Sequence, residues 1–416
     1  MSIIILHSFL SILFCASTTI LARCDVRFFG LMFLSLVYFA FFGVTPIISE
    51  PYMLRSLMKV IQISTIFLTS AVISTLIILF TGRRLIVDFG PLPAKNVNSM
   101  RDAGLAVYML SAAVFSAYLA THGIPWLAEN PNLARHEFVS NAGYFQIFMT
   151  RGMPVGAICI CASELARKNR IITPLSGAII ISWLVLTFLQ GFRIHLMMAI
   201  LYLLMLYFYS TRKMSLTRFA FIAALISAIF ITISLIRFEN DSSVNITEII
   251  QHRIGFELLW ATNYSVQLSE IQGLWWGKTI FMDLYSALPG PGESFGDYLL
   301  NFANPRSDIV GLAALTPSVL SEAYLNFGNL GVLIFGAMTP IMFVPIHKLI
   351  GFQPAIGRTS LVIVPILLAQ VVEVGIGQTL ASRILPTVAF LLILGAVYRM
   401  QLGLRLRGRT YRPTMA

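Results

Sequence analysis

Arginines near the ends of long apolar runs are the residues whose type and position best indicate a chemistry. A guanidinium group binds phosphate oxygens through paired hydrogen bonds and stays charged at any physiological pH. Several guanidinium groups around one cavity would therefore suit a diphosphate headgroup. A second interpretation stays open for Arg151 and Arg237, because an arginine near a helix end commonly snorkels to the membrane interface. For Arg135 and Arg253 the second interpretation is a solvated charge in a loop. The arginines in question are Arg135, Arg151, Arg193, Arg237 and Arg253.

Glu322 is the acidic residue that the sequence singles out, in the run Ser-Glu-Ala-Tyr-Leu-Asn-Phe-Gly at residues 321–328, beside Tyr324 and Asn326. An unpaired carboxylate at membrane depth costs about 3 kcal/mol. Glu322 therefore either pairs with an arginine in a structural role or acts as a general base, and both roles stay open. His252 could titrate near neutral pH, although lone histidines are more often structural.

Motifs for nucleotides and metals are missing from the sequence. It has no Gly-x-x-x-x-Gly-Lys-Ser/Thr loop, no Gly-x-Gly-x-x-Gly, no metal-binding Cys/His spacing and no Asp-x-Asp pair. These absences speak against ATP hydrolysis and against soluble nucleotide-sugar donors, whereas a lipid-linked substrate stays open. We therefore expect no cofactor and no metal.

The elements that must position these residues are membrane helices. Hydrophobic residues make up 57% of the 416 residues and charged residues only 11%, whereas soluble domains carry about 25% charged residues. We predict an all-α integral membrane protein, with residues 1–416 as a single polytopic domain. Its apolar runs are long enough for about 11 transmembrane helices, within a range of about 10–12. These runs lie near residues 2–21, 28–46, 59–81, 103–121, 144–165, 172–190, 194–209, 219–236, 324–346, 360–377 and 384–400.

The basic residues indicate the orientation, because Lys and Arg concentrate in cytoplasmic loops. With eleven spans, one set of alternate loops and the C-terminal tail together carry 19 of the 29 Lys and Arg residues. This distribution predicts a cytoplasmic C-terminus and an N-terminus on the outer face. The net charge of +11 is then a mark of topology, so we expect no nucleic-acid partner.

Two external segments follow from this topology, at residues 121–141 and 238–320. The second is far longer than a connection between packed elements needs. Within it Ile246, Ile249 and Ile250 fall at helical spacing, and tryptophans stand at positions 260, 275 and 276. This pattern predicts amphipathic helices at the membrane interface. Because the internal loops are short, we expect the protein to act on the outer face.

Several stretches together resemble one family. The run Leu-Thr-Pro-Ser-Val-Leu-Ser-Glu-Ala-Tyr-Leu-Asn-Phe-Gly-Asn-Leu-Gly-Val-Leu, residues 315–333, resembles the segment that begins a late span in bacterial O-antigen polymerases, the Wzy-type oligosaccharide repeat unit polymerases. Gly123-Ile-Pro with Arg135 downstream, and Gly191-Phe-Arg193 before a helix, resemble other marks of that family. The layout is similar too, with many spans and one large periplasmic loop late in the chain.

The resemblance implies a metal-independent glycosyltransferase of the bacterial inner membrane. Such an enzyme takes undecaprenyl-diphosphate-linked oligosaccharide on the periplasmic face and transfers the growing glycan to a hydroxyl of a new unit. A chain-length regulator protein is a candidate partner. Our hypothesis is that Arg135, Arg193 and Arg253 bind and neutralise the departing diphosphate, with Arg193 as the catalytic arginine. Glu322 deprotonates or orients the acceptor hydroxyl. The expected substrate-binding residues are Arg135, Arg151, Arg253, His252 and Tyr324.

Two alternatives stay open beside the polymerase. A lipid-linked-oligosaccharide flippase would also need a cationic cavity, but the long external loop fits a flippase poorly. An O-antigen ligase or a similar transferase is the other alternative. Related ligases carry His-Asn near the start of a late span, where this chain has Thr316, Ser318 and Glu322. The repeat-unit sugars and the linkage have no readable code in the sequence.

Overall fold

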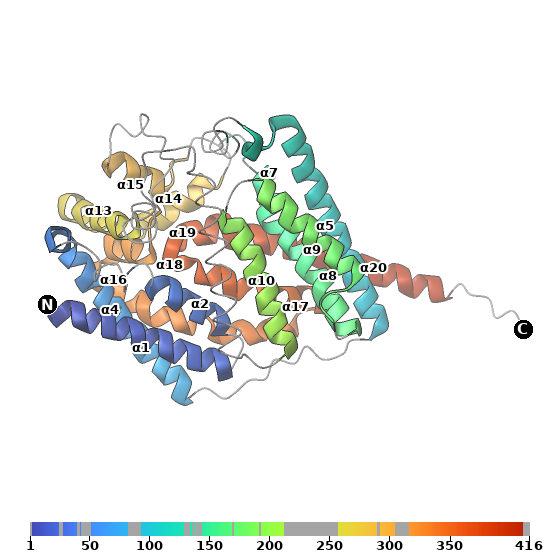
Figure 1. Ribbon diagram of the computed structural model, residues 1–416, viewed down its shortest axis with the longest axis horizontal. Coiled ribbons are helices and arrows are strands. Elements are labelled where there is room, and N and C mark those ends of the chain that lie inside the picture. The colour runs from blue at the N-terminus through green and yellow to red at the C-terminus, as the bar shows by residue number, and fades with distance from the viewer. Residues whose placement is uncertain are drawn as a thin grey trace, which may run out of the picture. The chain divides into compact units, whose positions relative to one another are not determined.

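A computed structural model shows an all-helical chain (Figure 1). All regular elements among the residues that it describes are helices, which confirms the predicted fold class. The described residues are 2–24, 28–39, 42, 51–81, 93–128, 134, 138, 144–168, 170–190, 193–211, 257–288, 292–303 and 316–410.

Seven helical stretches among these residues are long and apolar enough to cross a membrane. They confirm a multi-pass membrane protein, and all of them coincide with predicted apolar runs. The number of eleven spans stays a prediction, because residues 219–236 and most of 39–46 lie outside the described residues. The seven stretches are Ile3–Arg23, Leu57–Thr81, Lys95–His122, Phe145–Lys168, Val319–Ile346, Pro354–Val374 and Ile376–Arg405.

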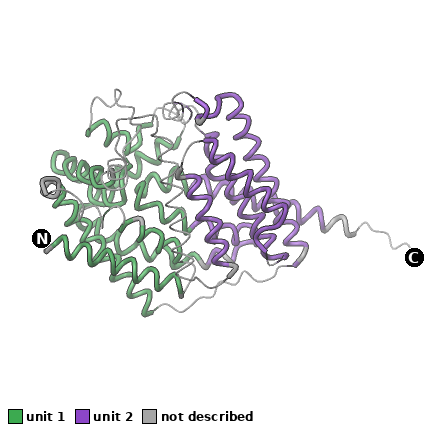
Figure 2. The backbone as a smooth tube through the Cα atoms, viewed as in Figure 1, with its two compact units in different colours: residues 1–85, 238–346, 365–384 green, residues 86–237, 347–364, 385–416 purple. Residues whose placement is uncertain are grey.

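The chain divides into two compact units, coloured separately in Figure 2. Unit 1 comprises Met1–Leu85, Phe238–Ile346 and Pro365–Ile384, and unit 2 comprises Ile86–Arg237, His347–Val364 and Leu385–Ala416. The segments η7 (Val344–Gly351) and α17 (Pro354–Ala369) contain boundaries between them. The single polytopic domain over residues 1–416 stays a prediction.

In unit 1, the long helices α4 (Pro51–Thr81) and α16 (Val319–Ile341) pack closely against each other. A Cβ atom at Gly336 would lie 2.5 Å from the carbonyl oxygen of Phe67, so only glycine permits this approach. Ser74 Oγ donates to the carbonyl of Ala337 at 2.9 Å. Small residues and interhelical hydrogen bonds are the usual means of helix association in lipid. The other helices of unit 1 are α1 (Ser2–Cys24), α2 (Phe29–Tyr38), α13 (Glu257–Gln272), α14 (Lys278–Ser286), α15 (Phe295–Ala303), α18 (Val371–Val374), α19 (Ile376–Gln378) and the π-helical η8 (Thr379–Ile384).

In unit 2, α5 (Ala94–His122) crosses α8 (Met153–Lys168) at two glycines. A Cβ atom at Gly156 would lie 2.8 Å from the carbonyl oxygen of Gly104, which again indicates packing through small residues. Thr173 and Ser176 form a capping box at the start of α9 (Pro174–Leu189). The remaining elements are η3 (Pro125–Leu127), α7 (Phe145–Ile147), the π-helical η4 (Phe148–Gly152), α10 (Arg193–Thr211) and α20 (Leu385–Thr410).

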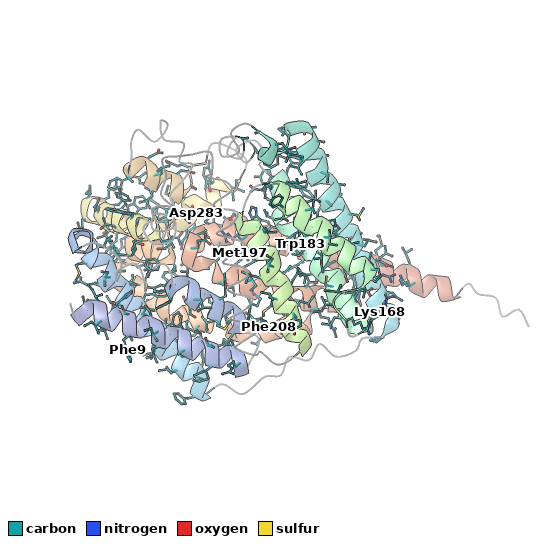
Figure 3. The ribbon with its side chains drawn as sticks, viewed as in Figure 1. Phe9, Lys168, Trp183, Met197, Phe208 and Asp283 are labelled. Atoms are coloured by element: carbon teal, nitrogen blue, oxygen red, sulfur yellow. The ribbon has the colours of Figure 1, made fainter. Side chains whose placement is uncertain are left out.

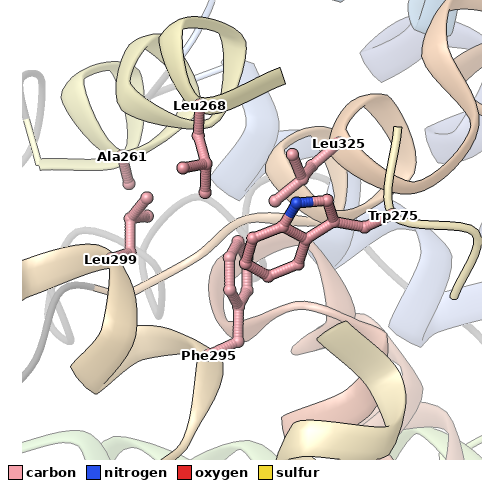
Figure 4. Close-up of a cluster of buried hydrophobic side chains, with 6 residues drawn as sticks. All are labelled: Ala261, Leu268, Trp275, Phe295, Leu299 and Leu325. Atoms are coloured by element: carbon pink, nitrogen blue, oxygen red, sulfur yellow. The ribbon is translucent and has the colours of Figure 1, made fainter. Parts of the chain in front are cut away.

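The predicted external loop contains α13, α14 and α15, which fold onto the first turns of α16. Their shared core consists of Ala261, Leu268, Trp275, Phe295, Leu299 and Leu325 (Figure 4). The Trp275 ring meets the Phe295 ring edge-on, with centroids 6.2 Å apart, a favourable aromatic geometry. Trp275 is thus a core residue, whereas Trp276 is 75% exposed. The amphipathic pattern at 246–254 lies outside the described residues, so its interfacial helix stays a prediction.

Candidate functional site

The structure describes some of the predicted site residues and not others. Arg135, His252 and Arg253 lie outside the described residues. Arg193 is the first residue of α10, but its side chain is outside what the structure describes. Glu322 belongs to unit 1 and Arg151 to unit 2. The two therefore belong to two separate candidate regions.

Glu322 lies in the first turn of α16 and is 0% exposed. The main-chain N–H of Ile376 donates to its Oε2 at 2.5 Å. The N–H of Gly377 lies 3.2 Å from both carboxyl oxygens. These donors are at the start of α19, where helical N–H groups lack partners within their own helix. Among the described residues Glu322 is therefore held by main chain and not, as one interpretation of the sequence required, by an arginine.

The break between α18 and α19 is built around two glycines. Gly375 has φ +79° and ψ 176°, a backbone region that is essentially open to glycine alone. A Cβ atom at Gly375 would lie 2.7 Å from the carboxyl carbon of Glu322. A Cβ atom at Gly377 would lie 2.7 Å from Oδ2 of Asp283. Both glycines therefore make room for carboxyl groups.

Asp283 of α14 is the second carboxyl group at this position. It is 2% exposed, and its Oδ1 accepts the N–H of Phe295 at 2.8 Å. Its Oδ2 and the carboxyl group of Glu322 both lie against Gly377. The main chain of Gln378 also approaches, but Oδ2 receives no N–H or O–H hydrogen bond of ordinary geometry. Burial raises the pKa of the Asp283 carboxyl above its usual range. We call Asp283, Glu322 and the main chain of 375–377 the carboxyl site.

Asn326, one helical turn after Glu322, ties α16 to the start of α14. Its Nδ2 donates to the carbonyl of Glu322 at 2.9 Å and to Oγ1 of Thr279 at 2.6 Å. Its Oδ1 accepts the N–H of Gly277 at 2.9 Å. Tyr324 is half-buried and stands about 200° around the helix from Glu322. Asn326, and not Tyr324, is therefore the neighbour that holds the carboxyl site together.

A kink in α16 adds a main-chain connection to the same loop. Gly328 has φ +61° and ψ −151° inside the helix, which interrupts the helical hydrogen bonds of the preceding turn. The carbonyls of Leu325 and Asn326 instead accept the N–H groups of Trp275 and Trp276, both at 3.0 Å. The loop segment before α14 is thereby fixed to the span that carries Glu322.

The second region lies in unit 2, around Arg151 and His195. Arg151 belongs to the π-helical η4, and its Nη1 donates to the carbonyl of Thr150 at 2.9 Å. His195 Nδ1 lies 2.7 Å from Oε1 of Gln190. Both side chains line a small cavity with Trp183 of α9, which is labelled in Figure 3. We call it the arginine cavity.

The arginine cavity is small. A water-sized molecule has about 10 Å³ of space for its centre there, which is about the room that one water needs. The structure thus brings Arg151 together with His195, whereas the diphosphate hypothesis calls for several arginines around one cavity. In this conformation, however, the cavity would not hold a diphosphate group.

Sequence reasoning missed Asp283, Gly375 and Gly377. Two signals were available: a single acid inside the apolar run Ile-Phe-Met-Asp-Leu-Tyr, residues 280–285, and the Gly-Ile-Gly of 375–377 at the end of a predicted span. Within the part of the chain that the structure describes, no group of three or more His, Cys, Asp or Glu side chains could hold a metal ion. The metal-free reaction stays an expectation.

Comparison with known proteins gives one result. The family model described as "Putative O-antigen polymerase" matches residues 2–378, a range that includes both candidate regions. No curated protein matches the chain, and no solved structure matches it. Because the family model covers nearly the whole chain, the protein belongs to the O-antigen polymerase family.

Proposed function

We propose that this chain polymerises undecaprenyl-diphosphate-linked oligosaccharide repeat units on the periplasmic face of the bacterial inner membrane. The observation that carries the proposal is the family match over residues 2–378. The seven apolar helices support a substrate that is held in the membrane by its lipid. The concentration of Lys and Arg in one set of loops supports a cytoplasmic C-terminus and an outward N-terminus.

The proposed reaction transfers a glycan between two lipid-linked units. The bond between the anomeric carbon of the growing glycan and its diphosphate breaks, and a bond from that carbon to the acceptor hydroxyl oxygen forms. The undecaprenyl diphosphate leaves with its negative charge, and the hydroxyl proton passes to a base. Stabilising the departing charge is the step in which an enzyme contributes most.

We assign the diphosphate to arginines, which bind phosphate bidentately without a metal. Arg193 at the start of α10 is the proposed catalytic arginine. Arg151 has support from its position beside His195 in the arginine cavity. The further proposed substrate contacts are Arg135, Arg253, His252 and Tyr324.

We propose Glu322 as the base. Its support is a carboxyl group at the start of a span, fixed by main-chain donors and adjacent to the loop helices. Because Glu322 has no exposed surface, this role requires α14 to move away when the acceptor hydroxyl enters. A chain-length regulator protein is a proposed partner at the outer face, where the loop helices would be accessible to it.

The test is a gel of surface lipopolysaccharide from a strain of the source organism that lacks this gene. A polymerase defect keeps the band with a single repeat and removes the ladder of longer chains. Loss of every repeat, including the first, would instead indicate a flippase or a ligase. Complementation with the wild-type gene must restore the ladder, which controls for effects on neighbouring genes.

A further inference from the structure

The carboxyl site contains two buried acids that lie against the same glycine. Asp283 and Glu322 are 2% and 0% exposed, respectively. Both carboxyl groups lie against Gly377, whose N–H is 3.2 Å from both oxygens of Glu322 and whose added Cβ atom would lie 2.7 Å from Oδ2 of Asp283. Within the described part of the chain neither acid takes part in an ion pair, whereas Asp102 and Glu164 do.

Other charged residues stand on the elements packed around Asp283, and they do not remove the need for a proton. Asp297 of α15 adds a negative charge that acts on Asp283. Lys278, on α14 itself, lies over the ring of Trp275, with Nζ 4.5 Å from the ring centre. The remaining titratable residues on α14, α15, α16 and η8 are Tyr285, Tyr298, Tyr324 and Arg383. Those on α4, α13 and α18, which pack against α16, include Lys59, Tyr264, Glu270 and Glu373.

We infer that Asp283 and Glu322 share a single proton and that Asp283 is thereby a positioning residue for Glu322. A hydrogen bond between two carboxyl groups requires a proton on one of them. Two ionised carboxylates in contact, away from water, would repel each other strongly. The shared proton turns this repulsion into a bond between α14 and α16.

The surrounding contacts explain why the pair is fixed. Main-chain N–H groups of Ile376 and Gly377 hold Glu322 from one side. The N–H of Phe295 holds Oδ1 of Asp283, whereas Oδ2 faces Gly377 and accepts no N–H or O–H, so Oδ2 is the oxygen that can share a proton with Glu322. The pair thus joins three segments that are far apart in the sequence: α14, α16 and the α18–α19 break.

The stability that the shared proton contributes depends on pH. Burial raises the pKa of Asp283 in the folded protein, so the folded state binds the proton more tightly than the unfolded chain does. The stabilisation is fully present below the ordinary carboxyl pKa and is lost as pH rises through the raised value. Alkaline pH should therefore loosen α14 from α16.

The test compares three variants by thermal unfolding of the purified protein in detergent, from about pH 5 to about pH 9, the range in which buried carboxyls titrate. Asp283→Asn keeps an oxygen for Phe295 and an N–H₂ group for Glu322 without a titrating proton. We expect its melting temperature to stay level on the alkaline side, where that of the wild type falls. Asp283→Ala removes the bond, so it should be less stable than Asp283→Asn at every pH. Glu270→Gln, at an exposed acid of α13, is the matched control and should follow the wild type.

Two results would overturn the inference. One is an Asp283→Asn protein that loses stability toward alkaline pH as steeply as the wild type. The other is an Asp283→Asn protein that is no more stable than Asp283→Ala. If Asp283→Ala does not fold, the change of the Asp283→Asn melting temperature with pH still tests the shared proton.

The shared proton is inferred from geometry, whereas the effect on polymer rests on the proposed function. Glu322→Gln separates the two. We expect this variant to be stable, with a melting temperature that stays level toward alkaline pH, because its amide can donate to Asp283. We also expect it to form no long chains. Stable Glu322→Gln protein that still makes the full ladder would refute the base role and leave the shared proton intact.

Discussion

The carboxyl site of unit 1 and the arginine cavity of unit 2 are built in different ways. In the carboxyl site, main-chain N–H groups, two glycines and an asparagine close around two acids, and no exposed surface remains on Glu322. In the arginine cavity, side chains from packed helices leave room for about one water beside Arg151. The carboxyl site should therefore be most sensitive to substitutions that change the shape of a residue, and the arginine cavity to substitutions that remove a charge.

Both regions lie at irregular helical segments. Unit 1 has the α18–α19 break at Gly375 and the kink at Gly328, and unit 2 has the π-helical η4 that carries Arg151. Irregular backbone at membrane depth is tolerated only where its polar groups find partners inside the protein. In the carboxyl site the freed N–H groups bind a carboxylate, so the irregularity itself creates the binding position.

The largest expected effect is that of Gly375→Ala. Alanine at this position would have to keep a backbone conformation that is open only to glycine. Its Cβ atom would also lie 2.7 Å from the carboxyl carbon of Glu322. Backbone strain costs about 1–3 kcal/mol and overpacking about 1–3 kcal/mol more. We expect poor recovery of folded protein and loss of the ladder.

Gly123→Ala is the matched control for that change. Gly123 has nearly the same backbone conformation, φ +81° and ψ 172°, but nothing lies within 4 Å of its added Cβ atom. It should show the strain alone, so the difference in melting temperature between the two variants measures the crowding at Glu322. Equal losses in both variants would refute the packing of Glu322 against Gly375.

The next largest effect is expected for Arg151→Ala, which removes the positive charge at the arginine cavity of unit 2. If Arg151 contacts the diphosphate, polymerisation should slow by about 100-fold, the usual loss when a stabilising group is removed. Arg151→Lys should restore only part of the rate, because an ammonium group cannot bind bidentately. The readout is the chain-length distribution on a gel. Lys168→Ala, at an exposed end of α8, is the control, and a normal ladder from Arg151→Ala would exclude Arg151 from the site.

Asn326→Ala should have a smaller effect on stability. It leaves the N–H of Gly277 and the hydroxyl of Thr279 without their buried partner, at about 1–3 kcal/mol. Asn329→Ala, three residues on and exposed, should change stability by less than about 0.5 kcal/mol. Thermal unfolding of both variants in one detergent checks this, and equal melting temperatures would contradict the tie between α14 and α16.

The smallest expected effect is that of Asp102→Asn in unit 2. Asp102 pairs with Arg101 and Arg405, and all three side chains are partly exposed. Such pairs contribute about 0–1 kcal/mol and are screened by salt. The melting temperature should therefore fall slightly at low salt and hardly at all at high salt. A large loss of stability that salt does not change would contradict this expectation, because it would show that the ion pair is shielded from salt.

The spans could be predicted from the sequence, because a run of apolar residues is a local signal of membrane insertion. Glu322 could be singled out for a similar reason, as an acid at the start of such a run. Its partners could not, because Asp283 and Ile376 are distant in the sequence and only the folded chain brings them to Glu322. The main chain as a binding partner also has no side-chain signature, apart from the glycines at 375 and 377 that it requires.

The most direct test of the account uses the purified protein in detergent with undecaprenyl-diphosphate-linked repeat units as the only substrate. We predict that the wild type converts single repeats into a ladder in the presence of a metal chelator, and that Glu322→Gln does not. Single repeats that remain unconverted by a correctly folded wild type would contradict the proposed polymerase activity. A ladder that the chelator abolishes would contradict the metal-free reaction.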